Sequence, residues 1–309
     1  MKKTLLILGV SGFVGSYLAA EFFNNGYDIY GADVQESDKL SEYIKFEKCD
    51  LLDNEAVKQL IYKVNPAYII NLAAVSSVGA SWNIPQKTIE VNVVGSLNIL
   101  EAVKALNKNI RVMFVGSSEE YAVSDVPIDE NAPLDANNPY GISKVMQENL
   151  AKLYRDRYGI KVYCVRSFNH TGVGQNENFV IPSWCKQVAE IEKSGKPGVI
   201  KVGNLEAERD FSDVRDIVNA YRLIIESENC SQVYNVGSGK AYKLSDLLEY
   251  IISLSSQEII VEVDSDRFRP IDNKVICCDN SLIKKELGWC PKSSIFSVTR
   301  EMLKNILGK

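Results

Sequence analysis

Short apolar runs alternate with helix-length amphipathic segments over most of the chain. We expect strands at residues 5–8, 28–32, 68–72, 111–115, 161–165 and 233–236, and helices at residues 13–24, 55–64, 89–106 and 141–158. Strands that alternate with helices predict an α/β fold built on a doubly wound parallel sheet. Both faces of such a sheet are covered by helices, which explains why these strands are uniformly apolar.

The regular alternation loosens after about residue 167, where loops rich in Asn, Gly and Pro interrupt it. We expect most of the C-terminal part to form a smaller α/β domain over the carboxyl edge of the sheet, where open α/β sheets bind their ligands. The predicted first domain comprises residues 1–167 and about 212–237, and the predicted second domain comprises about 168–211 and 238–309.

A glycine-rich turn lies between the first expected strand and the first expected helix, with the sequence GVSGFVG at residues 9–15. The first glycines of such a turn permit close backbone approach to a pyrophosphate, and the helix N-terminus favours the anion. The last glycine permits close packing of helix on strand. This context predicts a Rossmann domain that binds a dinucleotide. The candidate cofactor residues in the turn are Gly9, Gly12, Phe13, Val14 and Gly15.

Asp33 ends the second expected strand, about twenty residues further on, where a carboxylate would accept hydrogen bonds from ribose hydroxyls. A carboxylate there would repel a 2′-phosphate, so NAD(H) is favoured and NADP(H) is the alternative. Asp50 and Leu51 are candidates to flank the adenine. A helix cap or turn role is an equal alternative for Asp50.

The sequence YGISK at residues 140–144 contains a Tyr and a Lys four positions apart. On a helix these positions share one face, so the phenol and the ammonium point the same way. We expect the charge of Lys144 to lower the pKa of Tyr140 and make it an acid/base for a hydroxyl/ketone pair. Ser117 follows the strand expected at residues 111–115 and is placed to hydrogen-bond the reacting oxygen.

Together these motifs resemble the extended short-chain dehydrogenases/reductases, the group of nucleotide-sugar epimerases, dehydratases and reductases. The shared segments are GVSGFVG, NLAA at residues 71–74, SSEEY, YGISK and the RSFN that begins at Arg166. The resemblance implies that Ser117, Tyr140 and Lys144 are catalytic and that Lys144 also holds the nicotinamide ribose. It adds three candidate cofactor residues, Leu72, Ala73 and Ala74.

Downstream segments are similar to those of GDP-6-deoxy-mannose reductases. Residues 166–175 read RSFNHTGVGQ, residues 202–211 read VGNLEAERDF, and Arg269 fits the same pattern. Ser167 and Val173 replace prolines of that pattern, and neither change removes a reacting group. This resemblance implies reduction of the C4 ketone of GDP-4-dehydro-6-deoxy-D-mannose to GDP-D-rhamnose.

Glu119 leaves a second reaction open, because 4,6-dehydratases carry a Glu two residues after the catalytic Ser/Thr that removes the C5 proton. A reductase is favoured, since this chain has NHTGVGQ where dehydratases have an NHESPRRG-like segment, and since it is shorter than they are. Another nucleotide-sugar reductase or epimerase is a further alternative. A dinucleotide-binding sensor without catalysis would be expected to have a broken Ser, Tyr or Lys position, and all three are intact.

An activated sugar carries two phosphate charges, so cationic partners are expected from the second domain. The candidate substrate-binding residues are Ser76, Ser77, Ser118, Asn169, Lys201, Arg209 and Arg269. For Ser76 and Ser77 a purely structural role is equally open, and for the three cations so is a solvated surface charge. His170, the single histidine, is expected to make a structural hydrogen bond rather than act as a base.

Composition limits the class of protein and its surroundings. The 309 residues carry a net charge of −5 without a Lys/Arg tract, which argues against a nucleic-acid partner. Seven scattered Cys fit neither a zinc site nor a disulfide framework and suit a reducing compartment. No apolar run reaches the roughly 18 residues of a membrane span. We therefore expect a metal-free cytoplasmic enzyme without membrane contact. The family resemblance, rather than composition, implies a homodimer formed through the helices at residues 89–106 and 141–158.

Overall fold

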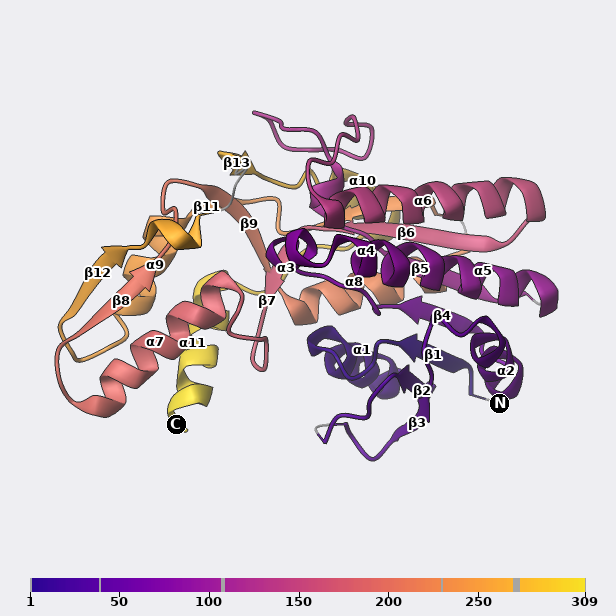
Figure 1. Ribbon diagram of the computed structural model, residues 1–309, viewed down its shortest axis with the longest axis horizontal. Coiled ribbons are helices and arrows are strands. Elements are labelled where there is room, and N and C mark those ends of the chain that lie inside the picture. The colour runs from indigo at the N-terminus through magenta and orange to yellow at the C-terminus, as the bar shows by residue number, and fades with distance from the viewer. Residues whose placement is uncertain (1, 39, 107–108, 229, 269–272, 309) are drawn as a thin grey trace.

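The larger of two lobes is built on a seven-stranded sheet with the order β10-β6-β5-β4-β1-β2-β3 (Figure 1). The computed structural model describes residues 2–38, 40–106, 109–228, 230–268 and 273–308. The strands of this sheet are β1 (Thr4–Leu8), β2 (Asp28–Asp33), β3 (Ile44–Lys48), β4 (Tyr68–Asn71), β5 (Arg111–Val115), β6 (Lys161–Ser167) and β10 (Val233–Val236). All neighbouring strands are parallel. The predicted doubly wound α/β sheet is confirmed, and its order reverses between β1 and β4.

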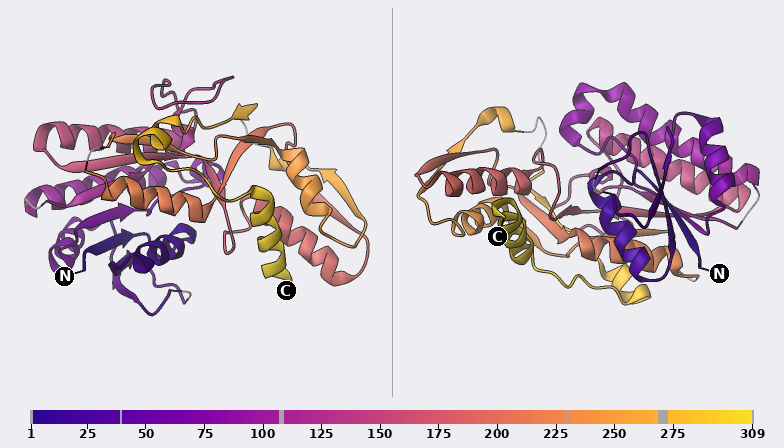
Figure 2. Two further views of the ribbon diagram at one scale, coloured as in Figure 1. Left: turned by 180° about the vertical axis from the view of Figure 1, so that it is seen from behind. Right: turned by 90° about the horizontal axis from the view of Figure 1, so that it is seen from below.

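Helices cover both faces of this sheet, as the right-hand view of Figure 2 shows. One face carries α1 (Phe13–Asn24) and α8 (Val214–Glu226), and the other carries α2 (Asn54–Val64), α5 (Gly95–Leu106) and α6 (Pro139–Tyr158). Apolar side chains such as Leu18 and Ile99 are completely buried between the layers. Each such side chain contributes about 1.5–3 kcal/mol of hydrophobic free energy.

The single helix expected at residues 89–106 is wrong in its first part. The structure has α3 (Val78–Asn83), α4 (Pro85–Ile89) and a π-helical turn, η1 (Glu90–Val94), before α5 begins. Within the turn, Asn92 Oδ1 accepts a 2.8 Å hydrogen bond from the Val75 amide, and Asn92 Nδ2 donates one of 2.8 Å to Ser143 Oγ. The wider turn thus joins the loop after β4 to α6. Apolar spacing does not reveal such contacts.

The smaller lobe contains two short sheets and a helical layer. One sheet has the order β11 (Ala241–Lys243), β9 (Glu208–Asp213), β13 (Val275–Ile276), with β7 (Asn169–Thr171) also paired to β9, and the other pairs β12 (Ile259–Val263) with β8 (Gly198–Val202). The helices packed in this lobe are α7 (Val180–Ser194), α9 (Leu244–Ile252) and α11 (Ile295–Leu307). The expected smaller α/β part is therefore present.

One C-terminal segment returns to the larger lobe. Helix α10 (Ser281–Leu287) contributes Ile283 to the core beneath α1 and α8, and Trp289 joins the same core. The Trp289 indole donates a 3.1 Å hydrogen bond to the Asp216 carbonyl. The residue limits of the two domains stay a prediction.

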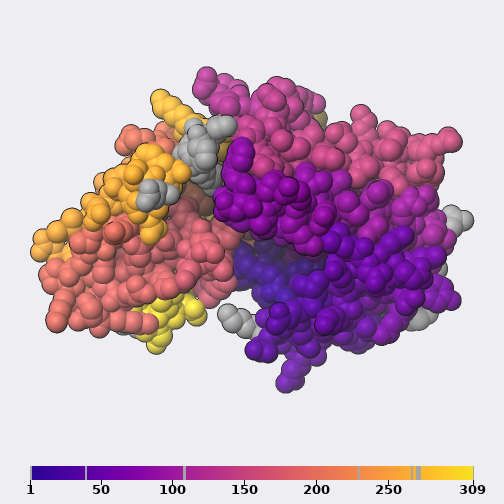
Figure 3. Space-filling model, viewed as in Figure 1, coloured from indigo at the N-terminus to yellow at the C-terminus, as the bar shows by residue number. Residues whose placement is uncertain are grey.

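The two lobes enclose a cavity between them. Strands β1, β4, β5 and β6 end at its floor, and the smaller lobe forms its opposite wall, with a cavity volume of about 1210 Å³ between them (Figure 3). All seven cysteines are free thiols, four of them buried. Within the described ranges, no helix has the length and apolar character needed to cross a bilayer.

Candidate active site

The glycine turn forms one wall of the cavity, and its three glycines are required for different reasons. Gly9 has φ of +83°, and a Cβ there would lie 2.5 Å from the Ala73 amide nitrogen. A Cβ on Gly15 would lie 2.1 Å from the Val10 carbonyl oxygen, so this position allows α1 to pack on β1. A Cβ on Gly12 would meet only the Gly9 carbonyl, at 3.4 Å, so here the missing side chain leaves space in the cavity itself.

Every predicted cofactor residue lines this cavity. These residues are Gly9, Gly12, Phe13, Val14, Gly15, Asp33, Asp50, Leu51, Leu72, Ala73, Ala74, Tyr140 and Lys144. Asp33 Oδ2 accepts a 3.1 Å hydrogen bond from the Ser11 amide, which fixes its carboxylate beside the turn. Asp50 Oδ1 accepts from the Leu52 amide at 2.9 Å, so the turn role proposed as its alternative is also present.

The start of α6 positions the Tyr–Lys pair. The Asn138 side chain caps the helix by accepting a 2.9 Å hydrogen bond from the Gly141 amide, and Pro139 occupies the first turn. Tyr140 and Lys144 follow on one helix face, and only 8% and 3% of their surfaces are exposed. Lys144 Nζ lies 5.8 Å from the centre of the Tyr140 ring and donates a 2.6 Å hydrogen bond to the Val115 carbonyl at the end of β5.

Burial determines the protonation of this pair. It raises the pKa of Tyr140 above its ordinary value of 10, and a hydrogen bond with Ser117 opposes the shift only in part. The expected lowering of the Tyr140 pKa by Lys144 is therefore wrong for this structure, since desolvation of the phenolate dominates. Burial also lowers the pKa of Lys144 to about 8. Tyr140 is accordingly a phenol that can donate a proton.

Ser117 is held at the end of β5 by a capping box. Its Oγ accepts a 3.2 Å hydrogen bond from the Glu119 amide, and its own amide donates a 2.7 Å bond to Glu120 Oε1. Sequence reasoning missed Glu120. The adjacent acids of SSEEY were a usable signal, since neighbouring side chains of a short turn point in different directions: Glu119 lines the cavity and Glu120 is completely buried.

Glu119 lies on the same side of the cavity as the Tyr–Lys pair. Its Oε2 accepts a 3.0 Å hydrogen bond from Asn138 Nδ2, so the residue that caps α6 also orients this carboxylate. The structure thus brings Ser117, Glu119, Tyr140 and Lys144 to one cavity.

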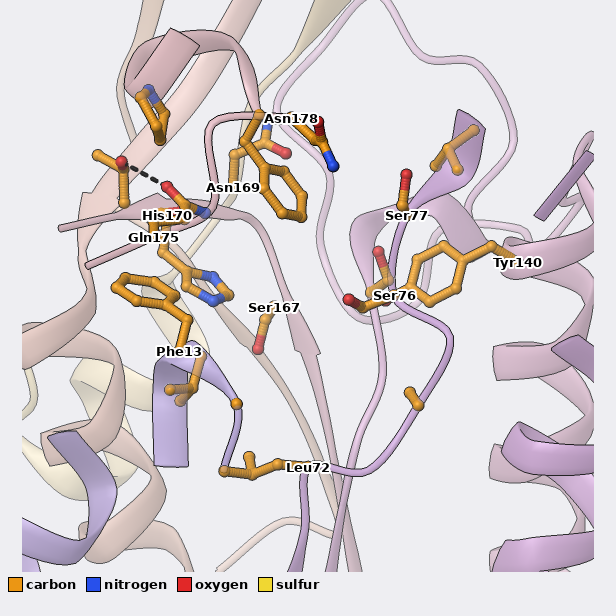
Figure 4. A pocket seen from close by; sticks show the side chains of 18 of the residues that line it. Phe13, Leu72, Ser76, Ser77, Tyr140, Ser167, Asn169, His170, Gln175 and Asn178 are labelled. Atoms are coloured by element: carbon orange, nitrogen blue, oxygen red, sulfur yellow. Dashed lines mark hydrogen bonds between the residues drawn. The ribbon is translucent and has the colours of Figure 1, made fainter. Parts of the chain in front are cut away.

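The predicted substrate residues divide into three groups. Figure 4 shows Ser76, Ser77 and Asn169 around the cavity, and Arg209 also lines it. Ser77 Oγ additionally caps α3 by accepting a 3.2 Å bond from the Ala80 amide, which is the structural role left open for it. Ser118 is buried outside the cavity lining, and Arg269 lies outside the described residues.

Lys201 is the clearest correction among the predicted substrate residues. It lies on β8 with 55% of its side chain exposed, away from the lining, and its Nζ is 4.0 Å from Glu262 Oε1. Its neighbours along β8 alternate in direction because successive strand side chains point to opposite faces. Val202 therefore lines the cavity, while Lys201 takes the solvated position that was the alternative.

Several lining residues were not predicted. They include Ser167, Gln175, Phe179, Trp184, Tyr221 and Arg267. Tyr221 lies on the apolar face of α8, where an aromatic residue gives no signal beyond a core position. The sequence pattern distinguishes Ser167 only as a replacement for proline.

His170 lies beside Phe13 on the same wall of the cavity, as Figure 4 shows. Its ring stacks on that of Phe13 with the ring centres 6.5 Å apart, and its Nδ1 lies 3.1 Å from the Phe168 carbonyl. Burial lowers the pKa of His170, so it is neutral near pH 7. Within the described part of the chain, no three His, Cys, Asp or Glu side chains gather in a way that could hold a metal ion.

A doubly wound sheet with a glycine turn at its switch point, a Ser after β5, and a Tyr and a Lys on the adjoining helix α6 defines an extended short-chain dehydrogenase/reductase. A family model described as GDP-mannose 4,6 dehydratase matches residues 6–302, and the chain belongs to that family. The predicted enzyme class, an NAD(P)-dependent nucleotide-sugar oxidoreductase, and the predicted resemblance are thereby confirmed.

Individual relatives divide between two reactions. The chain is 29% identical to GDP-6-deoxy-D-mannose reductase of Pseudomonas aeruginosa, over 98% of this chain and 97% of the relative. It is 27% identical to GDP-mannose 4,6-dehydratase of Vibrio cholerae, over 98% of this chain and 93% of the relative. A solved structure titled as RMD from Pseudomonas aeruginosa complexed with NADPH is similar, with 27% identity, a TM-score of 0.84, and coverage of 100% of this chain and 98% of that one.

Proposed function

We propose that this protein reduces the C4 ketone of GDP-4-dehydro-6-deoxy-D-mannose to GDP-D-rhamnose, with NAD(H) as the favoured cofactor. The observation that carries the proposal is the placement of Ser117, Tyr140 and Lys144 in one cavity whose wall is formed by the reductase-like segments at residues 166–175 and 202–211. The Tyr140 phenol can donate the proton that the ketone oxygen takes up during reduction. The identity of 29% to the reductase relative, against 27% to the dehydratase relative, supports the same choice.

The cavity walls fit a dinucleotide. The glycine turn offers backbone amides and open space at Gly12, and Asp33 lies where an adenosine ribose would be held. Lys144 would hold the nicotinamide ribose. When bound, the dihydronicotinamide supplies the hydride that C4 of the sugar receives. The Asp33 carboxylate favours NAD(H) over NADP(H), although a similar structure is titled as a complex with NADPH.

The chain's own residues supply the proton. Tyr140 transfers its phenolic proton to the ketone oxygen as C4 becomes tetrahedral, and the Ser117 hydroxyl donates a hydrogen bond to the same oxygen. Lys144, charged below about pH 8, stabilises the phenolate left on Tyr140. Arg209 and Arg267, which line the far wall, would contact the diphosphate.

A dehydratase is the second candidate, and Glu119 is the observation that favours it. This carboxylate lines the same cavity as Tyr140 and is oriented by Asn138. In a dehydratase it would remove the C5 proton after oxidation at C4, and water would leave across C5–C6.

The decisive experiment supplies purified protein with GDP-4-dehydro-6-deoxy-D-mannose and NADH, and in parallel with GDP-mannose and NAD. Consumption of NADH with the keto sugar, abolished in Tyr140→Phe and retained in Glu119→Gln, is expected for the reductase. Conversion of GDP-mannose to the keto sugar without net change in NADH, lost in Glu119→Gln, would establish the dehydratase instead. Turnover in neither assay, despite tight dinucleotide binding, would contradict both.

We also propose that the protein is a cytoplasmic homodimer joined through the helical segment at residues 89–106 and through α6. Ile142, Met146 and Leu153 leave 44%, 41% and 57% of their surfaces exposed along this helix, which supports contact with a second copy. Light scattering of the wild type and of Leu153→Asp tests it, and a monomeric wild type would contradict it.

A further inference from the structure

A completely buried carboxyl lies behind the candidate catalytic serine. Glu120 follows Ser117 by three positions, and its Oε1 accepts the 2.7 Å hydrogen bond from the Ser117 amide. The missing side chain of Gly116 makes room for this carboxyl, because a Cβ at Gly116 would lie 2.3 Å from Glu120 Oε1. Gly116 does not have a positive φ, so the carboxyl, rather than the conformation of the turn, requires the glycine.

The hydrogen bond to Ser117 does not by itself account for a carboxyl at this position. A glutamine would accept from the Ser117 amide equally well. The second oxygen, Glu120 Oε2, is buried and has no hydrogen-bond partner among the residues that the structure describes. Arg166 Nε lies 4.0 Å from Oε2 but is hydrogen-bonded to Glu148 at 2.9 Å, so its charge is shared between two carboxyls. An ionised Glu120 is therefore only partly compensated by Arg166.

Lys144 reaches the same stretch of backbone from α6. Its Nζ donates a 2.6 Å hydrogen bond to the Val115 carbonyl, two residues before Ser117, and one of 3.3 Å to Gln147 Oε1. Both of these partners are neutral, so they do not offset the charge of a side chain that is almost completely buried. The carboxyl whose charge favours the ammonium form of Lys144 is Glu120. Two buried groups of opposite charge thus converge on residues 115–117, at the end of β5.

We propose that Glu120 is a positioning residue of the active site, which holds the Ser117 backbone and whose carboxylate keeps Lys144 charged at alkaline pH. This inference rests on the proposed ketone reduction, in which the Lys144 ammonium stabilises the phenolate left on Tyr140. Glu120 and Lys144 titrate as a coupled pair, since the charge of each favours the charged form of the other. The pKa values of both lie at about 8. Glu120 therefore gains its negative charge in the pH range where Lys144 would otherwise become neutral.

The other ionisable groups that face this pair change little over the same range. Arg166 and Glu148 form an ion pair whose charges offset each other. Burial raises the pKa of the Cys164 thiol well above its ordinary value of 9, and raises the pKa of the Tyr121 and Tyr140 phenols above 10. The acid of the pair is thus the group whose charge changes.

The test is the pH profile of kcat/KM for NADH-dependent reduction of the keto sugar, with each profile scaled to its own plateau at acid pH. In Glu120→Gln, which keeps the oxygen that accepts from Ser117 and removes the charge, the alkaline fall should begin about one pH unit lower than in wild type. In a Lys144→Arg background, where the cation does not titrate, the same substitution should produce no shift. A merely structural role for Glu120 would lower the plateau without moving the profile.

Glu148→Gln is the matched control, because it removes the other carboxyl that Arg166 contacts and leaves Glu120 in place. Its alkaline fall should not move to lower pH. An unmoved profile in Glu120→Gln, or a shift that persists in the Lys144→Arg background, would overturn the inference.

Infrared spectra test the same pair without a substitution at Glu120. The band of protonated carboxyl groups in the wild type should lose intensity as pH rises through about 8. In Lys144→Met this loss should move to higher pH, because no ammonium favours the carboxylate. An identical titration in both proteins would overturn the inference even if Glu120→Gln does not fold. A wild type that does not reduce the keto sugar would contradict the proposed function, and the infrared titration would still decide whether the two groups are coupled.

Discussion

The backbone amide of Ser117 donates a 2.7 Å hydrogen bond to Glu120 Oε1, so the candidate catalytic serine is held by a carboxyl with no exposed surface. Arg166 Nε lies 4.0 Å from the other oxygen of this carboxyl and is bonded to Glu148 at 2.9 Å. Burial, and then the charge of Glu148, raise the pKa of Glu120 to about 8. A group that holds the backbone of the candidate catalytic serine thus keeps its proton up to about pH 8.

Glu120→Gln should change how stability depends on pH. Between the ordinary pKa of 4.5 and about 8, the folded chain holds a proton on Glu120 that the unfolded chain releases. The free energy of unfolding therefore falls as pH rises through this window, by at most about 1.4 kcal/mol per pH unit from this group. The variant should lose that part of the slope in urea unfolding. The exposed Glu55→Gln should keep it, and equal slopes in Glu120→Gln and wild type would contradict the assignment.

The loss of the Lys144 proton should determine how the rate of ketone reduction falls at alkaline pH. Because burial lowers its pKa to about 8, the ammonium loses its charge above that pH, while Tyr140 stays protonated. We expect kcat/KM for ketone reduction to fall as pH rises above about 8. In Lys144→Arg, whose guanidinium does not titrate, the remaining activity should lack this limb. A limb that persists unchanged in the variant would belong to another group.

Two substitutions in the glycine turn should separate an effect on dinucleotide affinity from an effect on thermal stability. Gly12→Ala adds a methyl group that meets only Gly9 at 3.4 Å, so its melting temperature should match the wild type while dinucleotide affinity falls. Gly15→Ala places the methyl 2.1 Å from the Val10 carbonyl and should lower the melting temperature by several degrees or more. Calorimetry of both variants checks this, and a wild-type melting temperature in Gly15→Ala would be inconsistent with the close packing of α1 on β1.

Arg267 and Lys201 form a matched pair of cations in the smaller lobe. Their side chains are 44% and 55% exposed and lie 3.4 and 4.0 Å from a carboxylate, but only Arg267 lines the cavity. Arg267→Ala should raise KM for the GDP-sugar roughly tenfold or more, because a charge-assisted contact to phosphate is lost. Lys201→Ala should change KM by less than about twofold. Steady-state kinetics measure both KM values. A larger rise in KM for Lys201→Ala than for Arg267→Ala would exclude the assignment of Arg267 to the diphosphate.

Local sequence patterns were sufficient to predict the strands of the larger lobe and its glycine turn. The apolar runs of the parallel strands and the turn at Gly9–Gly15 identified the larger lobe, because buried strands and a phosphate turn have fixed residue requirements. The four-residue spacing of Tyr140 and Lys144 placed them together on α6 for the same reason.

Tertiary structure decided what depends on residues that are distant in sequence. The π turn at Asn92 exists because of contacts with Val75 and Ser143, and the buried state of Glu120 depends on how β5 meets α6 and β6. The sequence placed Lys201 near phosphate by motif, and only the strand register showed that it faces solvent. The hydrogen bond between the hydroxyls of Ser167 and Tyr221 spans 54 positions, so no local pattern contains it. Sequence determined the elements and the reacting groups, and packing determined their protonation and their partners, because burial and long-range contacts arise only when the chain is folded.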